Sequence, residues 1–402
     1  MKWKNKGSEL DNYAKGLVQQ YQKKNEKIYI FGAGILGKII VPAFIGYHCF
    51  GGFIDNDVNK QQRGVDGYPV ISFAQYMANG AEGFIVVAAD KANKPSIEGQ
   101  IQAEGLIERR DYWFYKEFMH DVFPVLSLYR YQLLYVNLAQ ISLTERCTLK
   151  CKDCAHGCFA VDFKSEDMSV DMAKQSADVL FGKVDRIREF VLIGGEPFLY
   201  DNLAEIIEYI GERYHHKMFV YCITTNGTII PKDNILELCR KYNMLIRISN
   251  YSETNKHLES KYAELENKLK EHQVTYVLGK KEELWFDYGF STAEREKIKK
   301  EIELIQVFDR CKTQCREIRG NRYYYCVMAR SISDNLEFGV GQEDYLDLSQ
   351  TDYNAKKEFL EFEYGYSDKG YLDMCNYCNG ADAVKHPIPA AVQMVREHDK
   401  RV

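Results

Sequence analysis

The sequence lacks a long hydrophobic run, an apolar leader behind its first lysines, and a large excess of charge of one sign. No stretch of about 18 uninterrupted apolar residues occurs and the opening residues MKWKNKGSEL are polar, so we expect neither a membrane-spanning helix nor a secretion signal. A formal net charge of −5 argues against nucleic acid or an anionic membrane as a partner. Internal repeats and low-complexity segments are missing as well. These absences predict a cytoplasmic protein.

What the chain does have is the composition of a folded protein of two or three domains. Of its 402 residues, 46% are hydrophobic and 28% are charged. Its 12 cysteines are unevenly spread. In a reducing compartment, clustered thiols bind metal more often than they pair with one another. Two clusters and three isolated residues are present: Cys147, Cys151, Cys154 and Cys158; Cys311, Cys315, Cys326, Cys375 and Cys378; and Cys49, Cys222 and Cys239.

Residues 1–136 read as a small doubly wound α/β domain. A buried strand is followed by a glycine-rich turn and an apolar helix, which is the opening of a βαβ unit. The glycines Gly32, Gly34 and Gly37 form a G-x-G-x-x-G pattern, and Asp55 ends the next strand about 20 residues later. We expect strands at 27–31, 48–54 and 83–89, and helices at about 93–104 and 110–135.

Residues 137–307 read as a second α/β domain, an open sheet or a barrel of parallel strands joined by helices. We expect strands near 139–144, 189–193, 218–224, 244–249 and 274–278, and helices near 168–182, 201–214, 232–242 and 254–272. From residue 308 to 402 this alternation fades into a loop-rich, tyrosine-rich module with a polar, loosely held tail from Pro387.

The first cysteine cluster is a CxxxCxxC run directly after a predicted strand. It brings three thiolates into one tight loop, close enough to bind one inorganic cluster. A structural zinc site needs four closed ligands, and Cys158 or His156 would have to supply the fourth, so a zinc knuckle is the alternative. Loop packing is the expected role of His156.

Two further motifs follow neighbouring strands and face the same rim as the cysteine loop. Gly194-Gly195-Glu196-Pro197 ends the strand FVLI, and Thr225-Asn226-Gly227 ends the next one. Glycine lets the backbone approach a ligand closely. The cysteine run and the GGEP motif together favour an iron-sulfur cluster over zinc.

With these motifs the chain resembles the radical S-adenosylmethionine (radical SAM) superfamily over about residues 140–285. The resemblance implies a partial (βα)6 barrel in which Cys147, Cys151 and Cys154 hold a [4Fe-4S] cluster whose fourth iron chelates S-adenosylmethionine. Reductive cleavage of S-adenosylmethionine would yield a 5′-deoxyadenosyl radical that abstracts hydrogen from the substrate. A one-electron reductant such as flavodoxin or ferredoxin is then an expected partner.

The same resemblance assigns cofactor contacts residue by residue. The GGEP backbone and Glu196 would receive the methionine amino group, with Pro197, Thr225 and Asn226 in the same rim. Ser249 and Asn250 stand where the superfamily contacts the ribose, and the loop after VTYVL stands where it holds the adenine. Trp285 is expected either beside the adenine or in the core.

The second cysteine cluster has a split pattern, which favours either a zinc ribbon or a second iron-sulfur cluster. After a radical SAM barrel it resembles the twitch module, a shortened SPASM domain that holds one auxiliary [4Fe-4S] cluster with four cysteines. Cys326, Cys375 and Cys378 are the expected ligands, joined by Cys311 or Cys315. The segment GNRYYYC predicts a hairpin with its turn near Gly320 and Asn321.

An auxiliary cluster with four cysteines has no open iron, so the resemblance implies electron transfer and therefore oxidation of the substrate. Epimerisation is the alternative, in which a thiol returns a hydrogen atom; Cys222 and Cys158 are the candidate donors.

The N-terminal domain resembles Rossmann-like domains beside sugar-modifying enzymes of glycan pathways. It would bind a nucleotide or nucleotide sugar, bind a nicotinamide dinucleotide, or serve as a scaffold. Asp55 would bind ribose hydroxyls in the first two cases and cap a loop in the third.

The leading hypothesis is thus an oxidoreductase or epimerase that acts on a sugar, cyclitol or nucleotide sugar. A peptide maturase and a non-catalytic metal-cluster protein are the alternatives.

Overall fold

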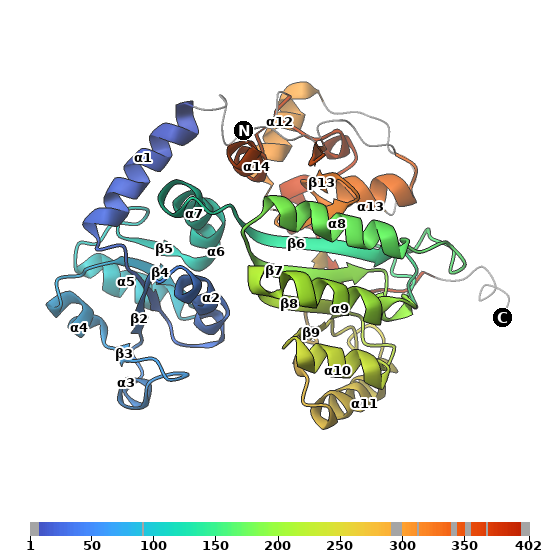
Figure 1. Ribbon diagram of the computed structural model, residues 1–402, viewed down its shortest axis with the longest axis horizontal. Coiled ribbons are helices and arrows are strands. Elements are labelled where there is room, and N and C mark those ends of the chain that lie inside the picture. Colours follow the sequence, from blue (N-terminus) through green and yellow to red (C-terminus); the bar gives the residue numbers. More distant parts are fainter. Residues whose placement is uncertain are drawn as a thin grey trace. The chain divides into compact units, whose positions relative to one another are not determined.

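The computed structural model describes residues 8–90, 92–290, 300–311, 313–338, 344–349, 355–366 and 369–394. The chain divides into two compact units between Asn137 and Leu138. Both are built on sheets with parallel strands covered by helices, which confirms the predicted α/β class (Figure 1).

The first unit has a five-stranded sheet in the order β3-β2-β1-β4-β5, and every pair of neighbours is parallel. This is the strand order of a doubly wound nucleotide-binding fold. The strands are β1 (Ile28–Phe31), β2 (Phe50–Ile54), β3 (Val70–Ile71), β4 (Phe84–Val87) and β5 (Tyr112–Phe114). The helices are α1 (Ser8–Lys23), α2 (Ile35–Gly46), α3 (Val58–Arg63), α4 (Phe73–Ala78), α5 (Lys94–Ala103), α6 (Tyr115–Glu117) and α7 (Phe123–Tyr131), with a π-helical turn at Phe118–Val122 between the last two.

One expectation for this unit is wrong. The stretch 110–135, predicted as helix throughout, begins with the edge strand β5, and the helix starts only at Tyr115. Tyr112 and Trp113 are buried beside β4. Aromatic side chains pack well on a pleated surface, and here that tertiary pairing outweighs the helical periodicity.

The second unit contains an eight-stranded sheet in the order β10-β9-β8-β7-β6-β12-β13-β14. The strands from β7 to β10 pair in parallel, β12 pairs in parallel with β6, and β12 to β14 form an antiparallel extension. The strands are β6 (Tyr135–Thr144), β7 (Arg186–Gly194), β8 (Met218–Thr225), β9 (Leu245–Ile248), β10 (Thr275–Leu278), β12 (Arg316–Arg319), β13 (Arg322–Tyr324) and β14 (Tyr345–Asp347).

Helices α8, α9 and α10 follow one another over one face of this sheet (Figure 1). Ser169 begins α8 by accepting a hydrogen bond from the Met172 amide at 3.2 Å. In α9 the buried residues recur at helical spacing: Leu203, Ile206, Ile207 and Ile210. The helices are α8 (Val170–Lys183), α9 (Leu203–Tyr214), α10 (Asp233–Lys241), α11 (Leu258–Glu271), α12 (Glu301–Arg310), α13 (Val327–Asn335) and α14 (Ala355–Glu363).

The predicted hairpin in the C-terminal region is confirmed. Strands β12 and β13 pair antiparallel through a turn at Gly320, whose φ of +59° glycine adopts without strain. Because β12 also pairs in parallel with β6, the C-terminal region extends the same sheet. The domain boundary that the sequence predicts between residues 307 and 308 stays a prediction.

Residues 387–394 of the tail are held by backbone pairing, contrary to expectation, and the rest of the tail lies outside the described residues. Strand β15 (Pro387–Pro389) pairs antiparallel with β11 (Leu284–Phe286), and the chain stays hydrogen-bonded as far as Met394. Backbone pairing, which polar composition does not reveal, fixes this segment. No helix among the described residues is long and apolar enough to cross a membrane.

Candidate active site

The loop after β6 places three cysteines around one cavity. Cys147, Cys151 and Cys154 line a space of about 320 Å³. The other walls come from three strands. Gly194 and Gly195 line the cavity at the end of β7, Thr225 at the end of β8, and Trp285 on β11. The carboxyl ends of parallel strands meet at one edge of a sheet, and ligands bind there in α/β folds.

Amide groups point at the sulfurs of two of these cysteines. The Cys147 Sγ accepts from the Leu149 backbone at 3.4 Å and from Asn226 Nδ2 at 3.5 Å. The Cys151 Sγ accepts from Gln393 Nε2 at 3.2 Å. Such donors stabilise a thiolate, which is the form that ligates iron.

The electrostatics of the loop differ between its cysteines. Burial raises the pKa of the Cys147 and Cys151 thiols to about 12. A hydrogen bond from the Cys158 thiol lowers the pKa of Cys154 to about 6, and the pKa of Cys158 itself is raised well above its usual value by the same bond. Metal binding would therefore release protons from the loop.

The two glycines of the GGEP motif pack against the segment that leads into Cys147. A Cβ at Gly194 would overlap the carbonyl oxygen of Thr144, and one at Gly195 would overlap that of Arg146. The Gly195 amide donates to the Thr144 carbonyl oxygen at 2.8 Å. The glycines thus position the cysteine loop as well as opening the cavity wall.

Replacing Gly195 with alanine should displace that loop. The new methyl group would press on the Arg146 backbone, and overpacking of this kind costs about 1–3 kcal/mol. We expect a lower free energy of unfolding, together with weaker iron uptake after anaerobic reconstitution. Gly182→Ala in α8 is the matched control, because no atom lies within 4 Å of its Cβ position. Equal iron uptake by both variants would contradict this role.

The Glu196 side chain is buried, and both of its carboxylate oxygens accept hydrogen bonds. Its carboxylate accepts from Thr225 Oγ1 at 2.8 Å, from the Asn226 amide at 2.9 Å and from the Phe198 amide at 3.2 Å. Burial raises its pKa to about 7 despite these donors. The side chain joins the ends of β7 and β8 and is not among the cavity-lining residues, and neither is Pro197.

Of the other predicted cofactor contacts, Thr225, Asn226 and Ser249 line the cavity, as does Trp285. Asn250 does not; its side chain accepts from the Ser252 amide at 3.1 Å in a local turn.

A second cavity, of about 400 Å³, is lined by four cysteines: Cys311, Cys326, Cys375 and Cys378. Phe286 and Tyr288 line both cavities, so the two cavities are adjacent. Among the described residues, no three His, Cys, Asp or Glu side chains converge closely enough to hold a single metal ion.

Cys315 stands apart from this second cavity. Its electrostatic neighbours include Glu189 of β7, Arg247 of β9 and Glu317 of β12. Of the two cysteines that the sequence leaves as alternatives, Cys311 lines this cavity and Cys315 does not. Cys222 is buried on β8 near the same Glu189 and Arg247.

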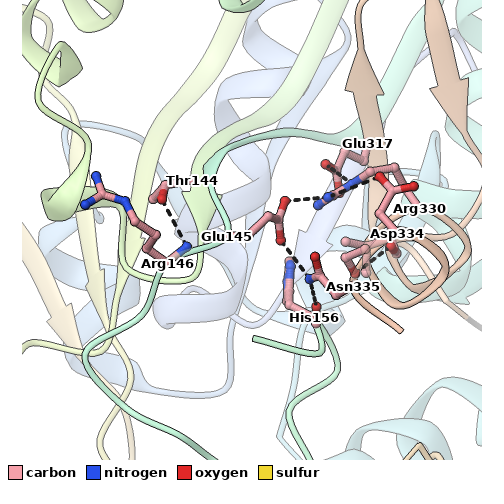
Figure 2. Close-up of polar contacts among 10 residues, drawn as sticks. Thr144, Glu145, Arg146, His156, Glu317, Arg330, Asp334 and Asn335 are labelled. Atoms are coloured by element: carbon pink, nitrogen blue, oxygen red, sulfur yellow. Dashed lines mark hydrogen bonds and ion pairs between the residues drawn. The ribbon is translucent and has the colours of Figure 1, made fainter. Parts of the chain in front are cut away.

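A buried charged network links the cysteine loop to α13 (Figure 2). Arg330 is 0% exposed and forms an ion pair with Glu317 at 2.7 Å and another with Glu145, two residues before Cys147. Asn335, at the end of α13, donates to Glu145 at 3.1 Å and to the His156 carbonyl oxygen at 2.7 Å. Because Cys326 precedes α13, this helix runs from one cysteine cluster to the other.

In the first unit, two of the three glycines of the G-x-G-x-x-G motif pack against backbone atoms of the same unit. A Cβ at Gly32 would crowd the Ala88 carbonyl oxygen, and one at Gly37 would overlap that of Gly32, whereas Gly34 faces open space. Asp55 accepts from the Ala33 amide and from Lys60 Nζ, both at 2.8 Å. Desolvation raises its pKa, but these donors leave it below the usual value. Asp55 therefore makes the contacts of a loop cap.

Sequence reasoning missed Arg330, Glu145 and Gln393. An arginine in a short helix and a glutamine in a polar tail carry no local signal. Only Glu145, two residues before a cysteine motif, was in a position to draw attention.

Part of the chain is similar to known proteins. Residues 141–255 match the model of the Radical SAM superfamily. The antilisterial bacteriocin subtilosin biosynthesis protein AlbA of Bacillus subtilis (strain 168) is 31% identical over 111 residues, which are 27% of this chain and 22% of that protein. The GTP 3′,8-cyclase of Synechocystis sp. is 27% identical over 172 residues, 42% of this chain and 48% of that protein. The chain thus spans about half or less of these curated relatives.

Among solved structures, BtrN in complex with AdoMet and 2-DOIA aligns with a TM-score of 0.40 and 13% identity, covering 64% of this chain and 97% of that one. Streptococcus suis SuiB bound to S-adenosylmethionine aligns with a TM-score of 0.29 and 21% identity, covering 46% and 44%. The matched family segment contains Cys147, Cys151, Cys154 and the GGEP motif. Residues 141–255 therefore form a domain of the Radical SAM superfamily.

Proposed function

We propose that this enzyme oxidises a hydroxyl-rich small molecule, such as a sugar, a cyclitol or a nucleotide sugar. Four cysteines around a cavity that adjoins the first one carry the proposal. The match to the Radical SAM superfamily implies a [4Fe-4S] cluster and S-adenosylmethionine as cofactors, and the second, auxiliary cluster is part of the proposal.

The first cavity fits these cofactors. Its three cysteines provide soft thiolate ligands, and their sulfurs already face amide donors. Bound there, the cluster and S-adenosylmethionine would supply a 5′-deoxyadenosyl radical. Ser249 and Trp285, which line the same cavity, would hold the nucleoside and keep water out.

The second cavity fits an electron acceptor. Oxidation of an alcohol to a carbonyl removes two hydrogen atoms. One leaves to the deoxyadenosyl carbon, whereas the other leaves as a proton and an electron, and the electron needs an acceptor. Cys311, Cys326, Cys375 and Cys378 would complete the ligand set of an auxiliary cluster beside the first cavity, leaving no iron open to substrate.

The substrate would lie against the sheet below the first cavity. Three residues at the strand ends line that cavity: Ile193, Thr224 and Ser249. Side chains two or four positions earlier on a strand face the same side. Those positions hold Glu189 on β7, Cys222 on β8 and Arg247 on β9.

Polar groups on this face support a polyol. Arg247 Nη2 lies 2.7 Å from Glu189 Oε1, and the Arg247 side chain is 39% exposed. Gln140 Nε2 and Ser142 Oγ on β6 are buried and have no hydrogen-bond partner in the described part of the chain. Gln140 lies opposite Glu317 in the β6–β12 register, and Glu317 is one of the electrostatic neighbours of Cys315. Mixed donors and acceptors suit alcohol groups, because each hydroxyl both donates and accepts.

Epimerisation is a second candidate, because two thiols, Cys222 and Cys315, share Glu189 and Arg247 as electrostatic neighbours. Cys315 would be a hydrogen donor in addition to the predicted Cys222, whereas the Cys158 thiol donates a hydrogen bond to Cys154 in the cysteine loop. A peptide substrate remains the third candidate, since AlbA is named for bacteriocin biosynthesis.

The test is an anaerobic reaction of the reconstituted, reduced enzyme with S-adenosylmethionine and a panel of sugars, cyclitols and nucleotide sugars in deuterated water. Mass spectrometry should show a product two mass units lighter and one 5′-deoxyadenosine per product. Incorporation of one deuterium without oxidation would instead assign epimerisation. Turnover of peptides alone would overturn the small-molecule proposal.

A further inference from the structure

The C-terminal segment Pro387–Met394 lies against the loop that carries Cys151. The Lys152 amide donates to the Val392 carbonyl oxygen and the Met394 amide to that of Lys150, both at 2.8 Å. These two hydrogen bonds flank an isolated antiparallel β-bridge, in which Cys151 and Gln393 are paired as residues of neighbouring strands are. The segment is thus paired with the cysteine loop as a short strand would be.

Side chains of the second unit hold this segment from its other side. Asn255 Nδ2 donates to the Ala391 carbonyl oxygen at 2.9 Å, and Thr254 Oγ1 donates to that of Ala390 at 2.6 Å. Ala391 is 0% exposed and packs with Leu149 and Cys151. The position of Gln393 is therefore fixed by groups other than its own side chain.

The Gln393 amide has only one orientation that satisfies its neighbours. Its Oε1 accepts from the Lys150 amide at 2.8 Å, and a backbone N–H can only donate. Its Nε2 must then face Cys151 Sγ, at 3.2 Å, while also donating to the Ala391 carbonyl oxygen at 2.8 Å. The hydrogen bond to the cysteine sulfur is thus imposed by the backbone around it.

We infer that Gln393 is a positioning residue that raises the reduction potential of the cluster held by Cys147, Cys151 and Cys154. This inference rests on the proposed function, because it requires the cluster at that site. Reduction adds negative charge to the cluster and its thiolates. An N–H donor aimed at one of those sulfurs stabilises the reduced state more than the oxidised one.

The donor stabilises the more negatively charged reduced state more than the oxidised one, so its loss should lower the ratio of reduced to oxidised cluster by a factor on the order of ten at a fixed potential. For a one-electron couple this corresponds to a midpoint about 59 mV more negative. The enzyme would then need a stronger reductant to begin turnover.

The experiment is an EPR-monitored redox titration of the reconstituted full-length protein and three variants, with the first cluster identified by its spectral change on adding S-adenosylmethionine. Gln393→Leu removes the donor. Gln393→Glu keeps the acceptor for Lys150 and places a carboxylate oxygen against the sulfur. Thr254→Val is the matched control, because it loosens the same segment without touching the bond to Cys151.

We expect more negative midpoints in both Gln393 variants, with iron content retained, and an unchanged midpoint in Thr254→Val. An unchanged midpoint in Gln393→Leu, or an equal shift in Thr254→Val, would overturn the inference and leave the proposed function intact. If Gln393→Leu lost its cluster, Gln393→Glu would decide by the same criterion. Failure of the unmodified protein to take up a cluster would overturn the proposed function itself, and the inference with it.

Discussion

Replacing Cys311 with alanine should remove about half of the iron from the reconstituted protein, whereas replacing Cys315 should remove none. Two [4Fe-4S] clusters amount to about eight iron atoms per chain, so Cys311→Ala should retain about four. Cys311 lines the second cavity with three other cysteines, and Cys315 does not. Iron and sulfide analysis after anaerobic reconstitution measures the difference.

The two variants should also differ in chemistry. Cys311→Ala should still cleave S-adenosylmethionine, because the first cavity is intact, but substrate oxidation should be lost with its electron acceptor. Cys315→Ala should oxidise substrate and would lose turnover only if its thiol were the hydrogen donor of an epimerase. Loss of iron from Cys315→Ala, with full loading of Cys311→Ala, would contradict the ligand set.

Replacing Arg330 with methionine should destabilise the second unit by about 3–5 kcal/mol. Arg330 is fully buried between Glu317 and Glu145, and breaking a buried ion pair by removing one partner leaves an uncompensated charge. The displaced Glu145 should also loosen the cysteine loop and reduce iron uptake. Urea unfolding measures the loss. Asp334→Asn is the control: this carboxylate is half exposed and 3.9 Å from Arg330, so we expect less than about 0.5 kcal/mol.

The defect of Arg330→Met should depend on pH. In the native protein, burial raises the pKa of Glu317, whereas burial of Glu145 is outweighed by Arg330, which holds its pKa below the usual value. Without Arg330, both folded pKa values would exceed the unfolded value of about 4.3. The folded variant would then bind more protons than the unfolded chain, so its stability should fall as pH rises above about 4.3. A deficit that shrank toward neutral pH would contradict the buried-charge account.

The sequence predicted the parts of this protein that depend on local pattern. Periodicity located the parallel strands, and the cysteine and GGEP motifs placed Cys147 and Gly195 at one edge of the sheet. Local pattern failed where tertiary pairing decides the outcome. The aromatic stretch that becomes β5 read as helix, and Gln393 sits in a segment held by backbone pairing across 242 positions of the chain.

The choice between Cys311 and Cys315 was also beyond the sequence. Both precede the hairpin by a few residues, and only the end of α12 and the start of β12 orient them differently. Arg330 gave no signal because its two carboxylate partners lie on other elements, one of them 185 positions away.

The most direct test of the account is whether this protein cleaves S-adenosylmethionine at the first cavity. The reconstituted protein, reduced with dithionite under anaerobic conditions, should convert S-adenosylmethionine to 5′-deoxyadenosine and methionine, as followed by chromatography and mass spectrometry. Replacing Cys147, Cys151 or Cys154 with alanine should abolish this cleavage. Iron-loaded protein that forms no 5′-deoxyadenosine, or cleavage that survives loss of these cysteines, would contradict the account.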